Sequence, residues 1–173
     1  MFARGFFGQG RRLGVFPVAI MFIALSLTLL LPPDTALGAR KKFVMRIYDY
    51  KTGEIYACTP ARPGGKLFFG WIHSLEKIPW NEYYHIDKNG ELILDTITFP
   101  AFGAGIPENK GRVCYVKDGL IYMEEIGQRF GELVWLNSHT ATRDITLNGK
   151  LVARGGQLPQ HTRLRLVIER KRQ

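Results

Sequence analysis

Beyond residue 40 the chain is divided into short runs of alternating apolar and polar residues, separated by dipeptides that favour tight turns. Three of these dipeptides are Asn89-Gly90, Asp118-Gly119 and Asn148-Gly149, which suit the left-handed conformations of a two-residue hairpin turn. No stretch after residue 40 keeps a helical period over four turns. The sequence therefore predicts an all-β domain, an antiparallel β-sandwich or barrel of about ten short strands.

The expected strands follow from the period-two pattern. Segments 59–65 and 126–132 are instead expected to form a loop and a turn, because they contain closely spaced Gly, Pro or polar residues. Pro79 is expected to block strand pairing in the turn that follows residue 73. The predicted strands are residues 43–48, 55–58, 66–73, 82–87, 91–99, 112–117, 120–125, 133–137, 145–147, 150–153 and 163–170.

The first 38 residues have a different composition. Arg4, Arg11 and Arg12 precede an uncharged apolar run from Leu13 to Leu31, and small residues follow up to Ala39. A positive flank, an apolar centre and a small-residue end are typical of a signal peptide. The run also approaches the roughly 20 residues that cross a bilayer. We therefore expect residues 1–38 to be a signal peptide or a membrane anchor, and residues 39–173 to be exported, in the periplasm or at the cell surface.

The charge of the chain is strongly positive, with 24 Lys and Arg against 15 Asp and Glu and a formal net charge of +9. These charges are scattered along the sequence. The one cluster begins at Arg163 and Arg165, which alternate with Leu164 and Leu166 and so belong on the solvent face of a strand. We therefore expect no nucleic-acid partner, because a basic total arises equally from a solvated face.

The two cysteines, Cys58 and Cys114, lie in an oxidising compartment if the domain is exported. One prediction is a disulfide between them, and the alternative is two separate buried thiols, since pairing needs Cα atoms within about 7 Å. Their spacing matches neither a redox motif nor a structural zinc site. No cofactor is predicted.

Reactive side chains are densest between residues 68 and 107. The first set, from His73 to Glu82, lies at the end of a predicted strand and in the polar turn after it. The second set lies in the glycine-rich loop around Gly103 and Gly105. In that loop two glycines that tolerate positive φ can direct successive N–H groups at an anion, and with Lys77 nearby such a site suits a small carboxylate ligand. The alternative is a compact loop whose glycines allow a sharp bend. The candidate binding residues are His73, Ser74, Glu76, Lys77, Glu82, Gly103 and Gly105.

A metal site is a second hypothesis for this region. His73, Glu76 and Glu82 offer nitrogen and oxygen ligands, which suggests a metal-dependent hydrolase as the alternative function. His85 is left out, because residues three apart on a strand point to opposite faces. The competing interpretation is structural: His73 caps the turn after its strand, and Glu82 accepts hydrogen bonds from Ser74 or backbone amides.

The aromatic residues of the same region are more often core than pocket lining. Trp80 is the one expected to be exposed for a partner, since it follows Pro79 in a polar turn.

The pattern His73-Ser74-x-Glu76-Lys77-x-Pro79-x-x-Glu82, followed by Gly103-Ala104-Gly105-Ile106-Pro107, resembles a small prokaryotic family described as a domain of unknown function, DUF1850. The resemblance extends over about residues 43 to 170. Members are typically short, exported or membrane-linked, and often encoded beside TAXI-type TRAP transporters. No catalytic residues are established for the family. The resemblance implies a non-catalytic accessory or binding module with a TRAP transporter subunit as partner.

Overall fold

The computed structural model describes residues 43–103 and 109–171. The predicted segment 1–38, its boundary with the exported domain, and Gly105 lie outside the described residues. Within them, no helix is long and apolar enough to cross a membrane. The strands are β1 (Phe43–Asp49), β2 (Ile55–Ala61), β3 (Lys66–Ile72), β4 (Pro79–Ile86), β5 (Leu92–Phe99), β6 (Val113–Lys117), β7 (Leu120–Glu124), β8 (Gln128–Phe130), β9 (Glu132–Leu136), β10 (Thr142–Leu147), β11 (Lys150–Arg154) and β12 (Arg163–Arg170).

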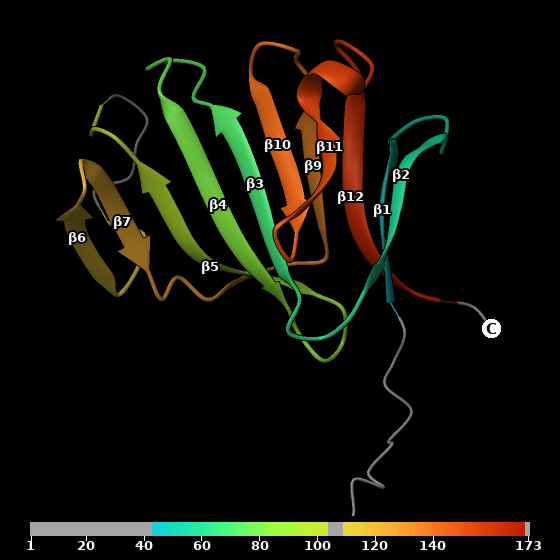
Figure 1. Ribbon diagram of the computed structural model, residues 1–173, viewed down its shortest axis with the longest axis horizontal. Coiled ribbons are helices and arrows are strands. Elements are labelled where there is room, and N and C mark those ends of the chain that lie inside the picture. The colour runs from blue at the N-terminus through green and yellow to red at the C-terminus, as the bar shows by residue number, and fades with distance from the viewer. Residues whose placement is uncertain (1–42, 104–108, 172–173) are drawn as a thin grey trace, which may run out of the picture. The chain divides into compact units, whose positions relative to one another are not determined.

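These strands form two antiparallel sheets, which confirms the all-β prediction (Figure 1). One sheet has four strands in the order β2-β1-β12-β9. The other has eight, in the order β11-β10-β3-β4-β5-β7-β6, with β8 paired to β5 beside β7. A single-turn 3₁₀ helix, Gly155–Gln157, leads from β11 toward β12. The described residues contain twelve strands, slightly more than the ten or so expected.

Two of the three predicted hairpin turns have the expected backbone. Asp118-Gly119 and Asn148-Gly149 each combine two positive φ angles, 50° with 74° and 51° with 75°, as a type I′ turn requires. At Asn89-Gly90 the prediction is wrong, because only Gly90 has a positive φ, of 93°. There the Asp87 carboxylate accepts from the amides of Asn89 and Glu91, and this local bonding favours a wider turn.

The inner faces of the two sheets share one hydrophobic core. Alternate residues of β1 and β12, such as Met45 and Leu166, are fully buried, as are Leu67 and Leu94 of the larger sheet, and all belong to a single cluster. Alternation along each strand places these side chains on one face. The fold is therefore a two-layer sandwich in which apolar residues from distant parts of the sequence meet.

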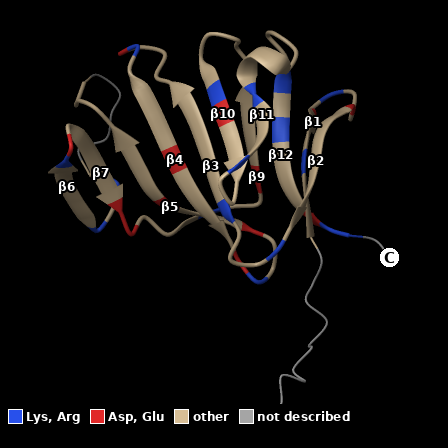
Figure 2. Cartoon of the chain, viewed as in Figure 1, with Lys and Arg blue, Asp and Glu red and all other residues tan. Residues whose placement is uncertain are grey.

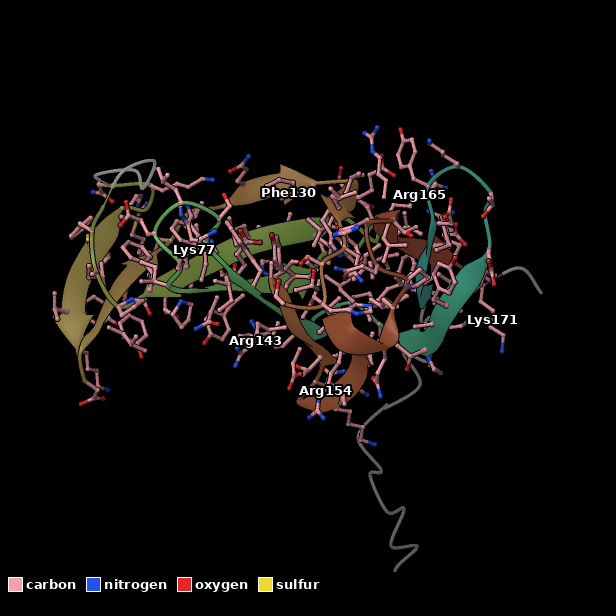
Figure 3. The ribbon with its side chains drawn as sticks, turned by 90° about the horizontal axis from the view of Figure 1, so that it is seen from above. Lys77, Phe130, Arg143, Arg154, Arg165 and Lys171 are labelled. Carbon is pink, nitrogen blue, oxygen red and sulfur yellow. The ribbon has the colours of Figure 1, made fainter. Side chains whose placement is uncertain are left out.

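The outer face of the four-stranded sheet is charged, as the alternation in β12 predicts. Arg165 lies over the Tyr48 ring, 4.6 Å from its centroid, and donates to the Tyr48 hydroxyl. Tyr48 in turn donates to Glu169, which also forms an ion pair with Arg46. Lys and Arg are scattered over both sheets (Figure 2), and Figure 3 shows Arg165 and Arg154 on opposite sides of the domain.

Two segments differ from the sequence prediction. Residues 59–61, expected in a loop, complete β2, since they pair with Phe43 to Met45 of β1. Residues 126–132, expected as a turn, contain β8, whose Phe130 lies opposite Leu92 of β5. A strand of three residues has no readable period, and both segments are held by pairing with a distant strand.

Candidate functional site

The turn that joins β3 to β4 is closed by its own first residue. The His73 amide donates to the Ile78 carbonyl at 2.8 Å, and the Lys77 amide donates to the His73 carbonyl at 2.8 Å. The Nδ1 atom of His73 accepts from the Glu76 amide at 3.3 Å. This confirms that His73 caps the turn. Pro79 does not prevent pairing, because it is the first residue of β4, opposite Ile72, a position that proline tolerates.

Glu76 lies directly against Gly103, so the two halves of the sequence motif meet. A Cβ atom added to Gly103 would lie 2.6 Å from Oε2 and 2.7 Å from Oε1 of Glu76. Gly103 does not have a positive φ, so the backbone there does not require glycine, and a larger residue would displace the end of the Glu76 side chain. Whether the loop also forms an anion site depends on Gly105, outside the described residues, and stays a prediction. Ser74 and Lys77 are exposed in the turn.

Glu82 occupies a different place from the turn. It lies in the middle of β4 on the inward face, between Trp80 and Tyr84, which are 6% and 3% exposed, because residues two apart on a strand share a face. Its Oε1 accepts from Trp80 Nε1 at 3.1 Å, and its Oε2 accepts from the Tyr84 hydroxyl at 2.6 Å. The expected donors, Ser74 and backbone amides, are therefore wrong: two aromatic neighbours on the same face hold the carboxylate.

Trp80 itself is buried, contrary to the expectation that it is exposed. Its ring is stacked on Phe99 with 4.9 Å between centroids and 7° between planes. Trp80 also contacts His73 and Trp71, at 5.7 Å and 5.6 Å between centroids. The turn and Glu82 are therefore connected through the indole ring of Trp80.

The Tyr84 hydroxyl is a persistent donor to Glu82. Burial raises the pKa of Tyr84 above its ordinary value, and the negative charge of Glu82 raises it further. The phenol therefore stays protonated well into the alkaline range. Glu82 is consequently fixed in orientation by two neutral donors.

A cavity of about 470 Å³ opens beside Glu82, between the eight-stranded sheet and β9. Its floor includes Phe69, Trp71 and Tyr84, and its other wall includes Phe130 and Trp135. We call this space the inter-sheet cavity. The remaining lining residues are Glu82, Leu94, Lys110, Gln128, Glu132, Leu133, Val134, Leu136, Ala141 and Thr142.

The wall of the inter-sheet cavity is formed where the chain changes sheets. After β7, positive φ angles at Glu125 and Gly127 bend the chain, which continues along β5 as β8 and then enters β9 of the four-stranded sheet. Figure 3 shows Phe130 of β8 on the same side of the domain as Arg165 of that sheet. Edge contacts of Phe130 with Tyr84 and of Trp135 with Phe69 fix the rings.

The structure does not gather a metal centre from the predicted ligands. Among the described residues there is no group of three or more His, Cys, Asp or Glu side chains that could hold a metal ion. His73 Nδ1 is engaged with the turn, and Glu82 with Trp80 and Tyr84. His85 points away from Glu82, as its spacing predicts, and pairs with Asp95 at 2.8 Å.

The predicted disulfide is not formed, and this prediction is wrong. Cys58 and Cys114 are both free, and both are exposed, so the alternative of two buried thiols is wrong as well. Cys58 belongs to β2, an edge of the four-stranded sheet, and Cys114 to β6, an edge of the eight-stranded sheet. These strands lie at opposite ends of the domain (Figure 1). The order of strands in the two sheets thus separates the cysteines.

Sequence reasoning identified Glu82 but missed the cavity around it. The alternation Trp80-x-Glu82-x-Tyr84 was an available signal, because it places one carboxylate between two large rings on an inward face. Phe130 and Trp135 carried no such signal. They reach the cavity only through the pairing of β8 and β9 with distant strands.

Comparison with curated proteins and with solved structures finds no match. A family model, described as Domain of unknown function (DUF1850), matches residues 68–153. The matched region runs from β3 into β11, and it contains the His73 turn, Gly103, Glu82 and the walls of the inter-sheet cavity. Over residues 68–153 the chain therefore belongs to the DUF1850 family.

Proposed function

We propose that this protein is a non-catalytic binding module, exported from the cytoplasm, which takes a small molecule in the inter-sheet cavity and works with a TAXI-type TRAP transporter. The observation that carries the proposal is the half-buried Glu82 carboxylate on the wall of that cavity. Binding sites for small molecules are concave and mostly apolar, with a few fixed polar groups. The inter-sheet cavity fits this description.

The hydrogen bonding of the motif residues supports a binding role over catalysis. A general acid or base must reach the proton that it transfers. His73 directs Nδ1 at the Glu76 amide, and each oxygen of Glu82 already accepts from a neighbouring ring. These bonds hold the two residues in fixed geometry, which suits recognition.

The association with a transporter rests on the family. DUF1850 proteins are often encoded beside TAXI-type TRAP transporters, and residues 68–153 belong to that family. We propose that the surface around the turn contacts a transporter subunit, because Leu75 is 62% exposed there next to Ser74 and Lys77. An exposed Leu beside a capped turn presents an apolar contact in a fixed position. The predicted signal or anchor segment would bring the module to the membrane.

A thermal-shift screen of the full-length chain tests the binding role. A ligand at a hundredfold over its dissociation constant adds about 2.7 kcal/mol to stability, which corresponds to roughly 5–11 °C for a protein of this size. The screen covers small carboxylates, amino acids and amines, each with and without EDTA. Glu82→Gln is expected to remove the shift, while Lys77→Gln leaves it in place. An EDTA-sensitive shift would favour the metal-dependent hydrolase instead.

Copurification tests the partner. The chain is expressed with the membrane subunits of a TAXI-type transporter, solubilised in mild detergent and captured by a tag. We expect those subunits to copurify in the presence of EDTA, and Leu75→Asp to reduce their recovery without lowering the melting temperature. If Leu75→Asp recovers the transporter subunits as well as the wild type does, the contact lies on another surface. If the wild-type chain recovers none of them, the association is contradicted.

A further inference from the structure

We propose that the inter-sheet cavity binds the ammonium group of a small organic cation, with Glu82 as its counter-charge and the surrounding aromatic rings as its walls. This inference rests on the proposed function, since it names the ligand class of the same cavity. It follows from the charge of the lining, the arrangement of the rings and the hydrogen bonds that position the carboxylate.

The lining of the cavity lacks the strong positive charge of the whole protein. The chain has a net charge of +9, but the cavity is lined by two carboxylates, Glu82 and Glu132, and one amine, Lys110. Arg165 lies 3.5 Å from Glu132 and offsets its charge. No ion pair joins Glu82 to any Lys, Arg or His side chain of the described part of the chain.

A half-buried carboxylate without a cationic partner favours a positively charged ligand. Trp80 and Tyr84 supply one hydrogen bond to each oxygen of Glu82, and a carboxylate oxygen has room for a further donor. These two donors are neutral, so the negative charge remains. Lys110 also lines the cavity and is exposed, and no ion pair joins it to another residue of the described ranges.

The rings of the lining add to this preference. Phe69, Trp71 and Tyr84 line one side of the cavity and Phe130 and Trp135 the other. The face of an aromatic ring carries negative electrostatic potential and attracts ammonium groups, most strongly for Trp. A carboxylate within an aromatic enclosure attracts a cation through both effects.

The test compares three probes of similar size against the full-length chain by isothermal titration calorimetry. Choline and tetramethylammonium carry the positive charge, and 3,3-dimethylbutanol has the shape of choline without it. We expect both cations to bind and the alcohol to bind at least tenfold more weakly. Glu82→Gln is expected to weaken the binding of choline by at least tenfold. The control Asp144→Asn, which neutralises a carboxylate outside the lining, is expected to weaken it by less than threefold.

A second variant covers the case in which Glu82→Gln does not fold. Phe130→Ala removes one wall of the cavity and leaves Glu82 with both of its donors. It is expected to weaken choline several-fold while leaving the circular dichroism spectrum unchanged. If choline binding is unaffected by Phe130→Ala, the cation inference is overturned.

The outcomes separate this inference from the proposed function. If choline and 3,3-dimethylbutanol bind equally well, the inference of a cation ligand is overturned, but the cavity remains a binding site. The same conclusion follows if Glu82→Gln binds choline as tightly as the wild type. The same holds if a carboxylate from the thermal-shift screen binds and neither cation does. If no ligand class binds and no transporter subunit copurifies, both the cation inference and the proposed function are overturned.

Discussion

Replacing Tyr84 by Phe tests whether the carboxylate of the site is held in place by its neighbour. The substitution keeps the ring and removes the hydroxyl that donates to Glu82 at 2.6 Å. A hydrogen bond to a charged group contributes about 1.5–3 kcal/mol, against about 1 kcal/mol for a neutral pair. We therefore expect Tyr84→Phe to lower the free energy of unfolding by about 2 kcal/mol.

A double-mutant cycle with Glu82→Gln isolates this bond from other effects of the change. In the Glu82→Gln background the acceptor is neutral, so Tyr84→Phe is expected to cost only about 1 kcal/mol, leaving a coupling energy of about 1 kcal/mol. Urea unfolding followed by tryptophan fluorescence measures all four proteins. With a slope of about 2 kcal/mol/M, the single variant shifts the midpoint by about 1 M. A coupling energy near zero would show that Tyr84 does not position Glu82.

The same variant carries a pH signature. Burial raises the pKa of Tyr84 above its ordinary value of 10.0, so the folded state keeps a proton that the unfolded chain releases. The resulting stability is fully present below about pH 10 and is lost as the pH rises further. The stability difference between wild type and Tyr84→Phe should therefore shrink above pH 10. A difference that is constant from pH 8 to pH 11 would contradict the burial of the hydroxyl.

Three further predictions concern the frame around the site. The Asn137 side chain is fully buried, and its amide group donates to three backbone carbonyls. Asn137→Asp should therefore lower the free energy of unfolding by about 3 kcal/mol, as measured by urea unfolding. A loss below about 1 kcal/mol would show that these bonds do not stabilise the fold. A Cβ at Gly155 would overlap the Thr142 carbonyl and lie 2.6 Å from the Thr142 Cβ. Because overpacking a core is destabilising, Gly155→Ala should lower the free energy of unfolding by at least about 2 kcal/mol. An unchanged melting temperature would refute this prediction. The hydrogen bond from the Tyr48 hydroxyl lowers the pKa of Glu169 below its ordinary 4.5. This bond therefore stabilises the fold above about pH 4.5, and its contribution is lost as the pH falls further. Glu169→Gln should reduce the loss of stability on acidification, and an unchanged loss would argue against the bond.

The amino-acid sequence by itself determined the local structure of this protein. The turns Asp118-Gly119 and Asn148-Gly149 and the cap formed by His73 were predictable because each depends on a few consecutive residues. The strand pattern was predictable for the same reason, since alternation requires only neighbours along the chain. Asn89-Gly90 shows the limit of such rules: the carboxylate of Asp87, two residues away, changed the turn.

Only the tertiary structure decided where the candidate site lies. The contact of Glu76 with Gly103, the separation of Cys58 from Cys114, and the meeting of Phe130 with Tyr84 all depend on which strands pair and in which register. Strand pairing joins residues far apart in sequence, and its energy comes from packing across two sheets rather than from local preference. Glu82 could therefore be identified as a site residue from the sequence, whereas the cavity around it could be found only from the fold.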